Sequence, residues 1–131
     1  MSRKASRALI VVAHGSGTAA WHSAFADLVA DLEADVQVRS WSAVRPAFLG
    51  GRAPNIESVS AQLVADGFRE IVVFPAFIAP GVHVTTDIPA MVDALRMRHP
   101  SVRYTVLPTV TELPSVRRAI GAAIKARVDD P

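Results

Sequence analysis

The sequence predicts a single three-layer α/β domain in which a mainly parallel sheet of four strands carries helices on both faces. Short, continuous apolar runs, typical of strands buried on both faces, alternate along the chain with segments whose apolar residues recur every three or four positions, as in helices. This alternation gives the order βαβαβαβα, and parallel strands joined by helical crossovers form an open sheet. The length of 131 residues predicts one domain, residues 1–131, and half of the residues are hydrophobic, enough for a core.

The first half of the chain supplies two strands and the helix between them. The apolar run ALIVVAH, residues 8–14, predicts the first strand, and Thr18 is a suitable N-cap for the helix that follows. The apolar stripe of that helix consists of Trp21, Phe25, Leu28, Val29 and Leu32. The alternating, β-branched segment 36–44 predicts a strand near the sheet edge, and the Gly- and Pro-containing segment 45–54 predicts a loop.

The second half continues the alternation. Asn55 is expected to cap a second helix, which Gly67 ends. The apolar segment EIVVFPAF, residues 70–77, predicts the third strand. The remaining elements expected are a loop up to Thr86, a helix over 87–99 with Pro89 in its first turn, a strand over 102–108 and a helix over 114–128.

Composition argues against several classes of partner. The net charge is only +2, the basic residues form no long run, and two Trp, one Tyr and five Phe offer no stacking platform, so nucleic acid is not an expected partner. No apolar run is long enough for a membrane span, and the run after the basic N-terminus is too short for a signal peptide. The chain has no cysteine, which excludes disulfides and thiolate metal sites and fits the expected cytoplasmic location.

Two histidines are expected at the carboxyl edge of the sheet, where ligands bind in folds of this type. His14 ends the first predicted strand, and His83 lies in the loop after the third. Right-handed crossovers give the strand order 2-1-3-4, in which the first and third strands are neighbours. The two imidazoles would then face each other, and neutral imidazole is the commonest ligand of borderline divalent metals. A hydrogen-bonded structural role for each histidine is an equally open interpretation at this point.

Other polar residues near this edge have simpler interpretations. His22, in the first turn of the first helix, is expected to be solvated, and His99, at a helix end, is expected to be structural. Asp87 is expected to cap the third helix, although the same helix N-terminus would also suit a substrate carboxylate. Ser16, His14 and Asp87 can be combined into a hydrolytic triad, but no nucleophile elbow or P-loop accompanies them.

The segments VVAHGSG, residues 11–17, and VVFPAFIAPGVHVTTDIP, residues 72–89, resemble the short class II chelatases of the CbiX/SirB type. The residues of the second segment that match the family pattern are Pro75, Gly81, His83, Asp87, Ile88 and Pro89. The resemblance extends over essentially the whole chain, including the helix start PNIESV at residues 54–59. It implies a homodimeric, lyase-type chelatase that inserts divalent cobalt, iron or nickel into sirohydrochlorin or a related tetrapyrrole, with no permanently bound cofactor.

The resemblance also implies roles for individual residues. His14 and His83 would be the catalytic residues and would bind the incoming metal, and His14 would also accept a pyrrole proton. The loop after the third strand and the loop opposite would contact the tetrapyrrole. The substrate-binding residues implied are Phe77, Ile78, Ala79, Pro80, Gly81, Val82, Gly51, Arg52 and Arg45. The two arginines can meet substrate carboxylates, or they can be ordinary solvated loop residues.

The chain departs from the family pattern around the predicted cleft. Gly17 stands where Arg or Lys is common, Gly50 and Gly51 stand where an acidic residue is frequent, and TVTE at residues 109–112 replaces Leu-Gly. Both histidines are retained. These departures keep open a second interpretation, a non-catalytic metal- or tetrapyrrole-binding protein of the same fold, and a third is a hydrolase with His14 as its base.

Overall fold

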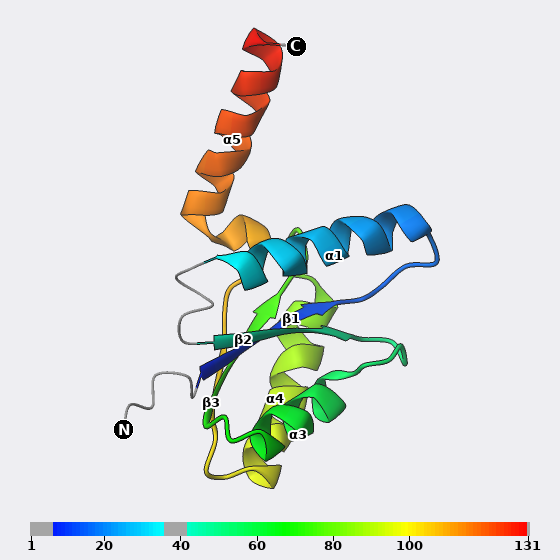
Figure 1. Ribbon diagram of the computed structural model, residues 1–131, viewed down its shortest axis with the longest axis vertical. Coiled ribbons are helices and arrows are strands. Elements are labelled where there is room, and N and C mark those ends of the chain that lie inside the picture. The colour runs from blue at the N-terminus through cyan, green and yellow to red at the C-terminus, as the bar shows by residue number, and fades with distance from the viewer. Residues whose placement is uncertain (1–6, 36–41, 131) are drawn as a thin grey trace.

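The fold is built around four parallel strands, as the sequence predicts (Figure 1). The structure, a computed structural model, describes residues 7–35 and 42–130. The strands are β1 (Arg7–Ala13), β2 (Ser42–Phe48), β3 (Glu70–Pro75) and β4 (Arg103–Val106). Their order across the sheet is β2-β1-β3-β4, and every neighbouring pair is parallel. The predicted α/β class and the predicted strand order are therefore confirmed.

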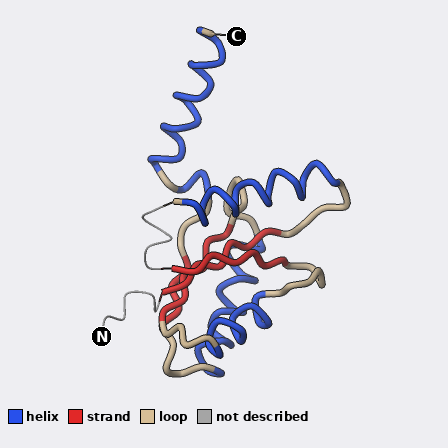
Figure 2. The backbone as a smooth tube through the Cα atoms, viewed as in Figure 1, coloured by secondary structure: helices blue, strands red, loops and turns tan. Residues whose placement is uncertain are grey.

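Helices lie on both sides of the sheet (Figure 2). Helix α1 (Ala19–Ala34) packs on one face, and α3 (Ile56–Ala65) and α4 (Ile88–Arg98) pack on the other. The last helix, α5 (Pro114–Asp129), is present as predicted, but it projects away from the sheet and buries none of its side chains. Of the helices in the described part of the chain, none combines the length and apolarity that a membrane crossing requires.

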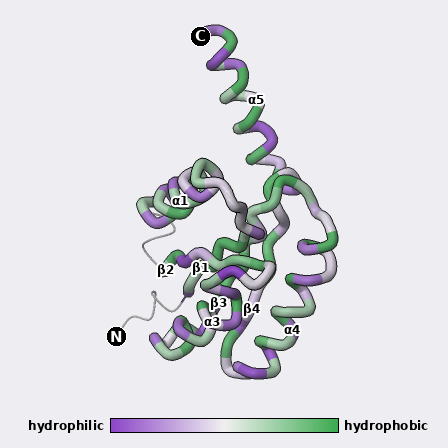
Figure 3. Tube along the Cα trace, turned by 90° about the vertical axis from the view of Figure 1, so that its right-hand side faces the viewer, coloured by the Kyte–Doolittle hydropathy of each residue, from purple (hydrophilic) through white to green (hydrophobic). Residues whose placement is uncertain are grey.

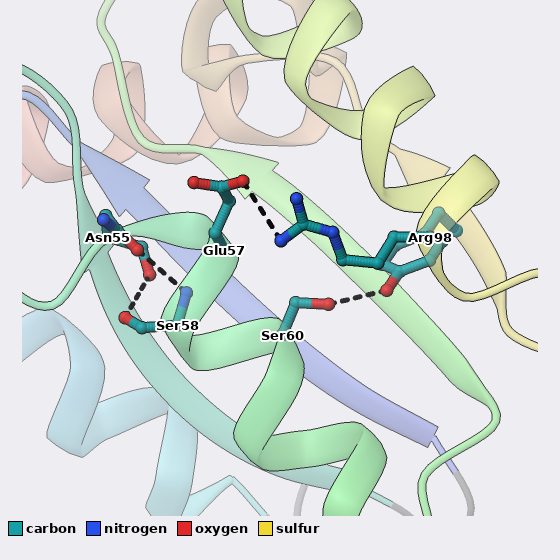
Figure 4. A network of polar contacts seen from close by, with 6 residues as sticks. Asn55, Glu57, Ser58, Ser60 and Arg98 are labelled. Atoms are coloured by element: carbon teal, nitrogen blue, oxygen red, sulfur yellow. Dashed lines mark hydrogen bonds and ion pairs between the residues drawn. The ribbon is translucent and has the colours of Figure 1, made fainter.

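Local signals set the helix ends at the predicted residues. The Thr18 hydroxyl accepts a hydrogen bond from the Trp21 backbone N–H at 3.3 Å and caps α1. The Asn55 side chain accepts from the Ser58 N–H at 2.8 Å and caps α3 (Figure 4). Gly67 follows α3 with φ of +99°, a left-handed conformation that ends the helix at little steric cost.

Two boundaries differ most from the prediction, and β3 and β4 each end two residues earlier than predicted. Residues 45–48, predicted as loop, belong to β2, and Pro46 is tolerated there because β2 is an edge strand, whose outer side needs no ladder hydrogen bond. Most of the strand predicted over 36–44 lies outside the described residues. The loop predicted up to Thr86 is shorter, because the π-helical turn η2 (His83–Asp87) runs directly into α4.

Two apolar clusters hold the helices on the sheet. The larger lies between the sheet and the α3–α4 layer, and the smaller lies under α1, where Phe25 and Val29 pack on β1 and β2. The fully buried aliphatic side chains of the larger cluster include Ile10, Ile56, Leu63, Ile71, Ile88 and Val92. Each such burial stabilises the fold by roughly 1.5–3 kcal/mol, so the sheet is a firm platform for its carboxyl edge. Figure 3 shows these apolar segments gathered around the strands.

Polar contacts join α3 to its neighbours (Figure 4). The Ser60 and Tyr104 hydroxyls lie 2.6 Å apart in the core, and Glu57 pairs with Arg98 of α4 at 3.4 Å. Burial raises the pKa of the Tyr104 phenol above its ordinary value of 10.0, and the hydrogen bond with Ser60 opposes part of this rise. These contacts tie α3 to β4 and α4.

Candidate functional site

The two predicted histidines lie next to each other at the carboxyl edge of the sheet. His14 directly follows β1, and His83 begins η2 after the adjacent strand β3. Their ring centroids are 5.0 Å apart, with the ring planes inclined by 40°. Both side chains reach solvent, and a metal ion with bonds of roughly 2 Å to one nitrogen of each ring fits a pair at this separation. The predicted juxtaposition is confirmed.

The carboxylate of Asp87 is hydrogen-bonded to the His83 ring. One carboxylate oxygen, Oδ2, lies 2.8 Å from Nδ1 of His83. Because an ionised carboxylate only accepts, Nδ1 carries the proton and the lone pair of Nε2 is free for a metal. The prediction that Asp87 caps the helix is wrong: its backbone is already helical, and its carboxylate faces the imidazole one turn earlier instead of the free N–H groups.

An apolar rim continues from His83. The Phe77 ring stacks on His83, with centroids 6.1 Å apart and planes inclined by 29°, and the partly buried Phe77 side chain also packs against the larger core cluster. Ile78 and Val82 are 73% and 70% exposed, and the residues between them, 79–81, are exposed as well. The structure thus places the whole predicted segment 77–82 beside the histidines, where it offers an apolar surface to a ligand.

Thr109 anchors this rim, a role that the sequence analysis missed. Its buried hydroxyl lies 2.7 Å from the Pro75 carbonyl, contacts the Phe77 carbonyl and accepts from the Phe77 N–H at 3.2 Å. Glu112 accepts from the Thr109 N–H at 3.1 Å and completes a capping box. The Thr-x-x-Glu spacing in TVTE was the available signal. The end of β3 is therefore fixed by side-chain as well as backbone contacts.

The loop after β2 also borders the histidine pair. Gly50 has φ of +72°, and a Cβ added there would lie 3.1 Å from Nε2 of His14. A Cβ added at Gly15 would lie 2.7 Å from Cδ and Nε of Arg52, so the Arg52 side chain crosses the turn beside His14. The structure thus brings Gly50 and Arg52 to the histidine pair, and the guanidinium gives this edge a positive group suited to a carboxylate.

A hollow of about 330 Å³ opens beside the same loop. Apolar side chains and two glycines form much of its lining: Phe48, Leu49, Ile56, Met91, Gly50 and Gly51. Neither histidine lines the hollow, but Gly50, which does, also approaches His14. The volume lies within the range of small-molecule sites.

Arg45 is not brought to the pair. It lies on β2, not in a loop, and pairs in register with Ile10, four residues before His14. At about 3.3 Å per residue, that is roughly 13 Å along the strand. Arg45 lines a separate hollow of about 390 Å³ against α3, which contains no histidine.

His22 is fixed rather than solvated, which corrects the prediction. Its Nε2 lies 2.5 Å from the Ser16 carbonyl oxygen, and its ring lies near Trp21 and Phe48. The half-buried ring therefore fixes the Gly-rich turn that follows His14. The first turn of α1 faces this turn, which is why the side chain does not reach water freely.

The hydrolytic triad is not assembled. The Ser16 hydroxyl accepts from the Thr18 N–H at 3.2 Å, and Asp87 is paired with His83 rather than with His14. Within residues 7–35 and 42–130, no group of three His, Cys, Asp or Glu side chains is placed to hold a metal. The two imidazoles therefore leave several coordination positions open, which favours exchange over permanent binding.

The sequence and fold have known relatives. The family model for CbiX matches residues 8–127. A sirohydrochlorin cobaltochelatase from Methanosarcina acetivorans is 34% identical over 71 residues, which are 54% of this chain and 50% of that protein. The chain thus spans about half the length of this curated relative.

Solved structures share the fold. A cobalamin biosynthesis CbiX protein from Marinobacter aquaeolei VT8 has a TM-score of 0.78 and 25% identity, over 95% of this chain and 99% of that one. The sirohydrochlorin chelatase SirB from Bacillus subtilis subspecies spizizenii, in complex with cobalt, has a TM-score of 0.69 and 27% identity, over 78% of this chain and 43% of that one. SirB from Bacillus subtilis with Fe³⁺ has a TM-score of 0.69 and 26% identity, over 79% of this chain and 40% of that one. With its match over residues 8–127, the chain belongs to the CbiX family.

Proposed function

We propose that this protein is a lyase-type chelatase that inserts a divalent metal ion into sirohydrochlorin or a related tetrapyrrole. The observation that carries the proposal is the pair of imidazoles, 5.0 Å apart at the carboxyl edge, with Asp87 behind one of them. The named activity of the Methanosarcina relative and the cobalt and iron complexes of SirB support it.

The metal is a substrate of the proposed reaction, not a resident cofactor. Nε2 of His83, freed by the hydrogen bond at Nδ1, and a nitrogen of His14 would hold the ion. Two neutral ligands bind weakly and leave the remaining positions to water and then to the ring nitrogens of the macrocycle. Imidazole accepts cobalt, iron and nickel alike, so the proposal covers all of these ions.

His14 would also take a proton from the macrocycle, at the nitrogen that the ion vacates when it passes to the ring. Metallation replaces pyrrole N–H protons by the ion, and a nearby base assists their removal. Among the described residues no carboxylate is hydrogen-bonded to His14, whereas Asp87 holds His83 in one tautomer. The two rings therefore differ: His83 is held by a carboxylate, and His14 has no carboxylate partner among the described residues.

The macrocycle would lie against the apolar rim. Phe77 and residues 78–82 would contact one face, and Gly51 and the hollow beside it would receive the other side. Arg52, which crosses the turn after His14, would meet a substrate carboxylate. We also propose that two copies act together, since the chain covers only 43% and 40% of the SirB chains that share its fold. The cytoplasmic location stays a prediction from the sequence.

A non-catalytic binding protein is the second candidate. It is favoured by Gly17 and Gly50, where no side chain supplies a further charge or ligand near the histidines. Such a protein would bind the metal or the tetrapyrrole without accelerating their combination.

Anaerobic absorbance measurements separate the two candidates. Sirohydrochlorin is mixed with Co²⁺, Ni²⁺ or Fe²⁺ in the presence of the protein, and metallation is followed by the change in its spectrum. We expect the protein to accelerate metallation, and we expect His83→Ala to lose this acceleration. Met97→Ala, at an exposed position on α4, should keep it. No acceleration over the spontaneous rate with any of these metals would sink the chelatase proposal, and binding without acceleration would favour the second candidate.

A further inference from the structure

Helix α5 carries an apolar stripe that its own chain does not cover. Ile120, Ile124 and Val128 follow one another at four-residue steps, which places them on one side of the helix. They are 44%, 59% and 71% exposed, and the helix projects from the domain (Figures 1 and 3). An isolated helix of 16 residues is only marginally stable in water, because forming its first turn is costly. Most helices in proteins gain their stability from packing an apolar face. The stripe therefore needs a surface to cover it.

One face of the sheet is covered across β1, β3 and β4. On the side of α3 and α4, Ala8, Ile71 and Tyr104 lie side by side in register. They are 0%, 0% and 4% exposed, so cover extends to the edge strand β4. This row is the reference for the opposite face.

The opposite face is left open over β3 and β4. On this face, the next residues in register are Leu9, Val72 and Thr105. Leu9 on β1 and Val72 on β3 are partly buried, whereas Thr105 on β4 is exposed. Leu107, just beyond β4, is 36% exposed. Helix α1 packs over β1 and β2, and no other helix of the described chain covers the rest of this face. The uncovered part of this face, beside α1, could be covered by one further helix.

The start of α5 directs it away from its own sheet. The 3₁₀ turn η3 (Val110–Glu112) is hydrogen-bonded to the Phe77 and Ile78 carbonyls at 3.1 and 3.0 Å. The Arg117 side chain then donates to the Thr111 carbonyl at 2.7 Å across the junction between η3 and α5. The bond between Arg117 and Thr111 crosses this junction and helps to hold α5 in its outward direction.

Charge favours a second copy of the chain as the partner. The acidic residues of α1, the neighbour of the open face, are exposed, and no ion pair involving them is formed within the described residues: Asp27, Asp31 and Glu33. Helix α5 carries the basic residues Arg117, Arg118, Lys125 and Arg127. Arg118 and Arg127 form no ion pair within the described residues, whereas Lys125 pairs with Asp129 of the same helix and Arg117 donates to Thr111. An α5 laid beside α1 would bring opposite charges together along both helices.

We propose that α5 of each copy packs on the open β3–β4 face of the other, beside its α1, in a reciprocal exchange. A two-fold symmetric pair uses both contacts at once. A helix of 16 residues is about 24 Å long and about 10 Å wide, so two helices and two faces would bury roughly 1,000 Å². That is about the minimum for a specific interface. The exchange would give the proposed pairing its surface, and because η3 holds Phe77 and Ile78, it would also steady the rim of the metal site.

The first test reads assembly and not metallation, so its outcome is independent of the proposed activity. Light scattering after gel filtration is expected to give a dimer for the full chain. Ile124→Asp should raise the dimer dissociation constant at least tenfold, whereas Ala122→Asp, the same charge two residues away on the other side of α5, should leave it unchanged. A monomer at all concentrations, or a dimer that Ile124→Asp leaves intact, would overturn the proposal.

The second test identifies the surface that α5 covers. The chain has no native cysteine, so Thr105→Cys can be combined with Ile120→Cys or Ile124→Cys without background. Oxidation is expected to link two chains covalently in at least one of these variants. A disulfide formed only within one chain would show that α5 folds back on its own sheet, and the absence of any link would show that it lies elsewhere. Either result would overturn the exchange.

Discussion

Replacing Asp87 by alanine removes the carboxylate that accepts the Nδ1–H of His83 at 2.8 Å. Without it, the imidazole can rotate, and the tautomer that protonates Nε2 becomes available. That tautomer cannot bind a metal through Nε2 without losing a proton. Metal affinity should therefore fall although neither proposed ligand has changed.

The size of the loss follows from the exposure of the pair. Removing a partner that orients a metal-binding histidine typically weakens affinity 10- to 100-fold. The side chains of His83 and Asp87 are 46% and 42% exposed, so water replaces part of the lost hydrogen bond. The expected loss is therefore at the lower end, about tenfold or ~1.4 kcal/mol. Asp87→Asn keeps an acceptor oxygen and should lose less.

Anaerobic calorimetry with Co²⁺ measures the affinity directly. Asp93→Ala is the matched control, because it removes a carboxylate from α4, the helix that η2 runs into, and that carboxylate pairs with Arg96 at 2.7 Å. Nitrogen NMR of the histidine rings should show Nδ1-protonated His83 in the wild type and a mixture of tautomers in Asp87→Ala. Equal Co²⁺ affinities for Asp87→Ala and Asp93→Ala would refute the positioning role.

Three further changes probe the site and the fold. Thr109→Val leaves the backbone partners of its buried hydroxyl unpaired and should cost about 1–3 kcal/mol in urea unfolding, and an unchanged midpoint would contradict the anchoring role. Gly50→Ala and Gly51→Ala both place a side chain at positive φ, which should lower the free energy of unfolding by about 1 kcal/mol each. Only the alanine at position 50 crowds His14, so only Gly50→Ala should also weaken Co²⁺ binding in calorimetry. Equal Co²⁺ affinities of the two variants would argue against the close approach of Gly50 to His14. Because the folded-state pKa of Tyr104 is raised, the unfolded chain loses this proton first, so stability should be level below about pH 10 and fall above it. Tyr104→Phe should remove that alkaline loss in urea midpoints at about pH 9 and 11, and a loss that persists would assign it to other groups.

Much of the fold could be predicted because each signal is local. The buried parallel strands read as continuous apolar runs, and Thr18, Asn55 and Gly67 mark helix ends through contacts within a few residues. The handedness of crossovers then fixes the strand order. Together these rules place His14 beside His83 although 69 positions separate them in the sequence.

The parts that were missed depend on contacts that no local pattern determines. Asp87 is equally suited to cap a helix or to bind an imidazole, and only the π-helical turn before it decides between them. The hydroxyl of Thr109 finds its partners 32 and 34 residues away on β3. Helix α5 has the periodicity of a helix that covers a sheet, but periodicity does not state which sheet it covers.

The central claim, that His14 and His83 jointly hold the metal during insertion, is tested most directly by a double-mutant cycle on the metallation rate. The rate with sirohydrochlorin and Co²⁺ is measured anaerobically for the wild type, His14→Ala, His83→Ala and the double variant. A metal held between two rings needs both, so each single variant should lose nearly as much as the double variant. A single variant with the wild-type rate, or two losses that simply multiply in the double variant, would contradict the shared site.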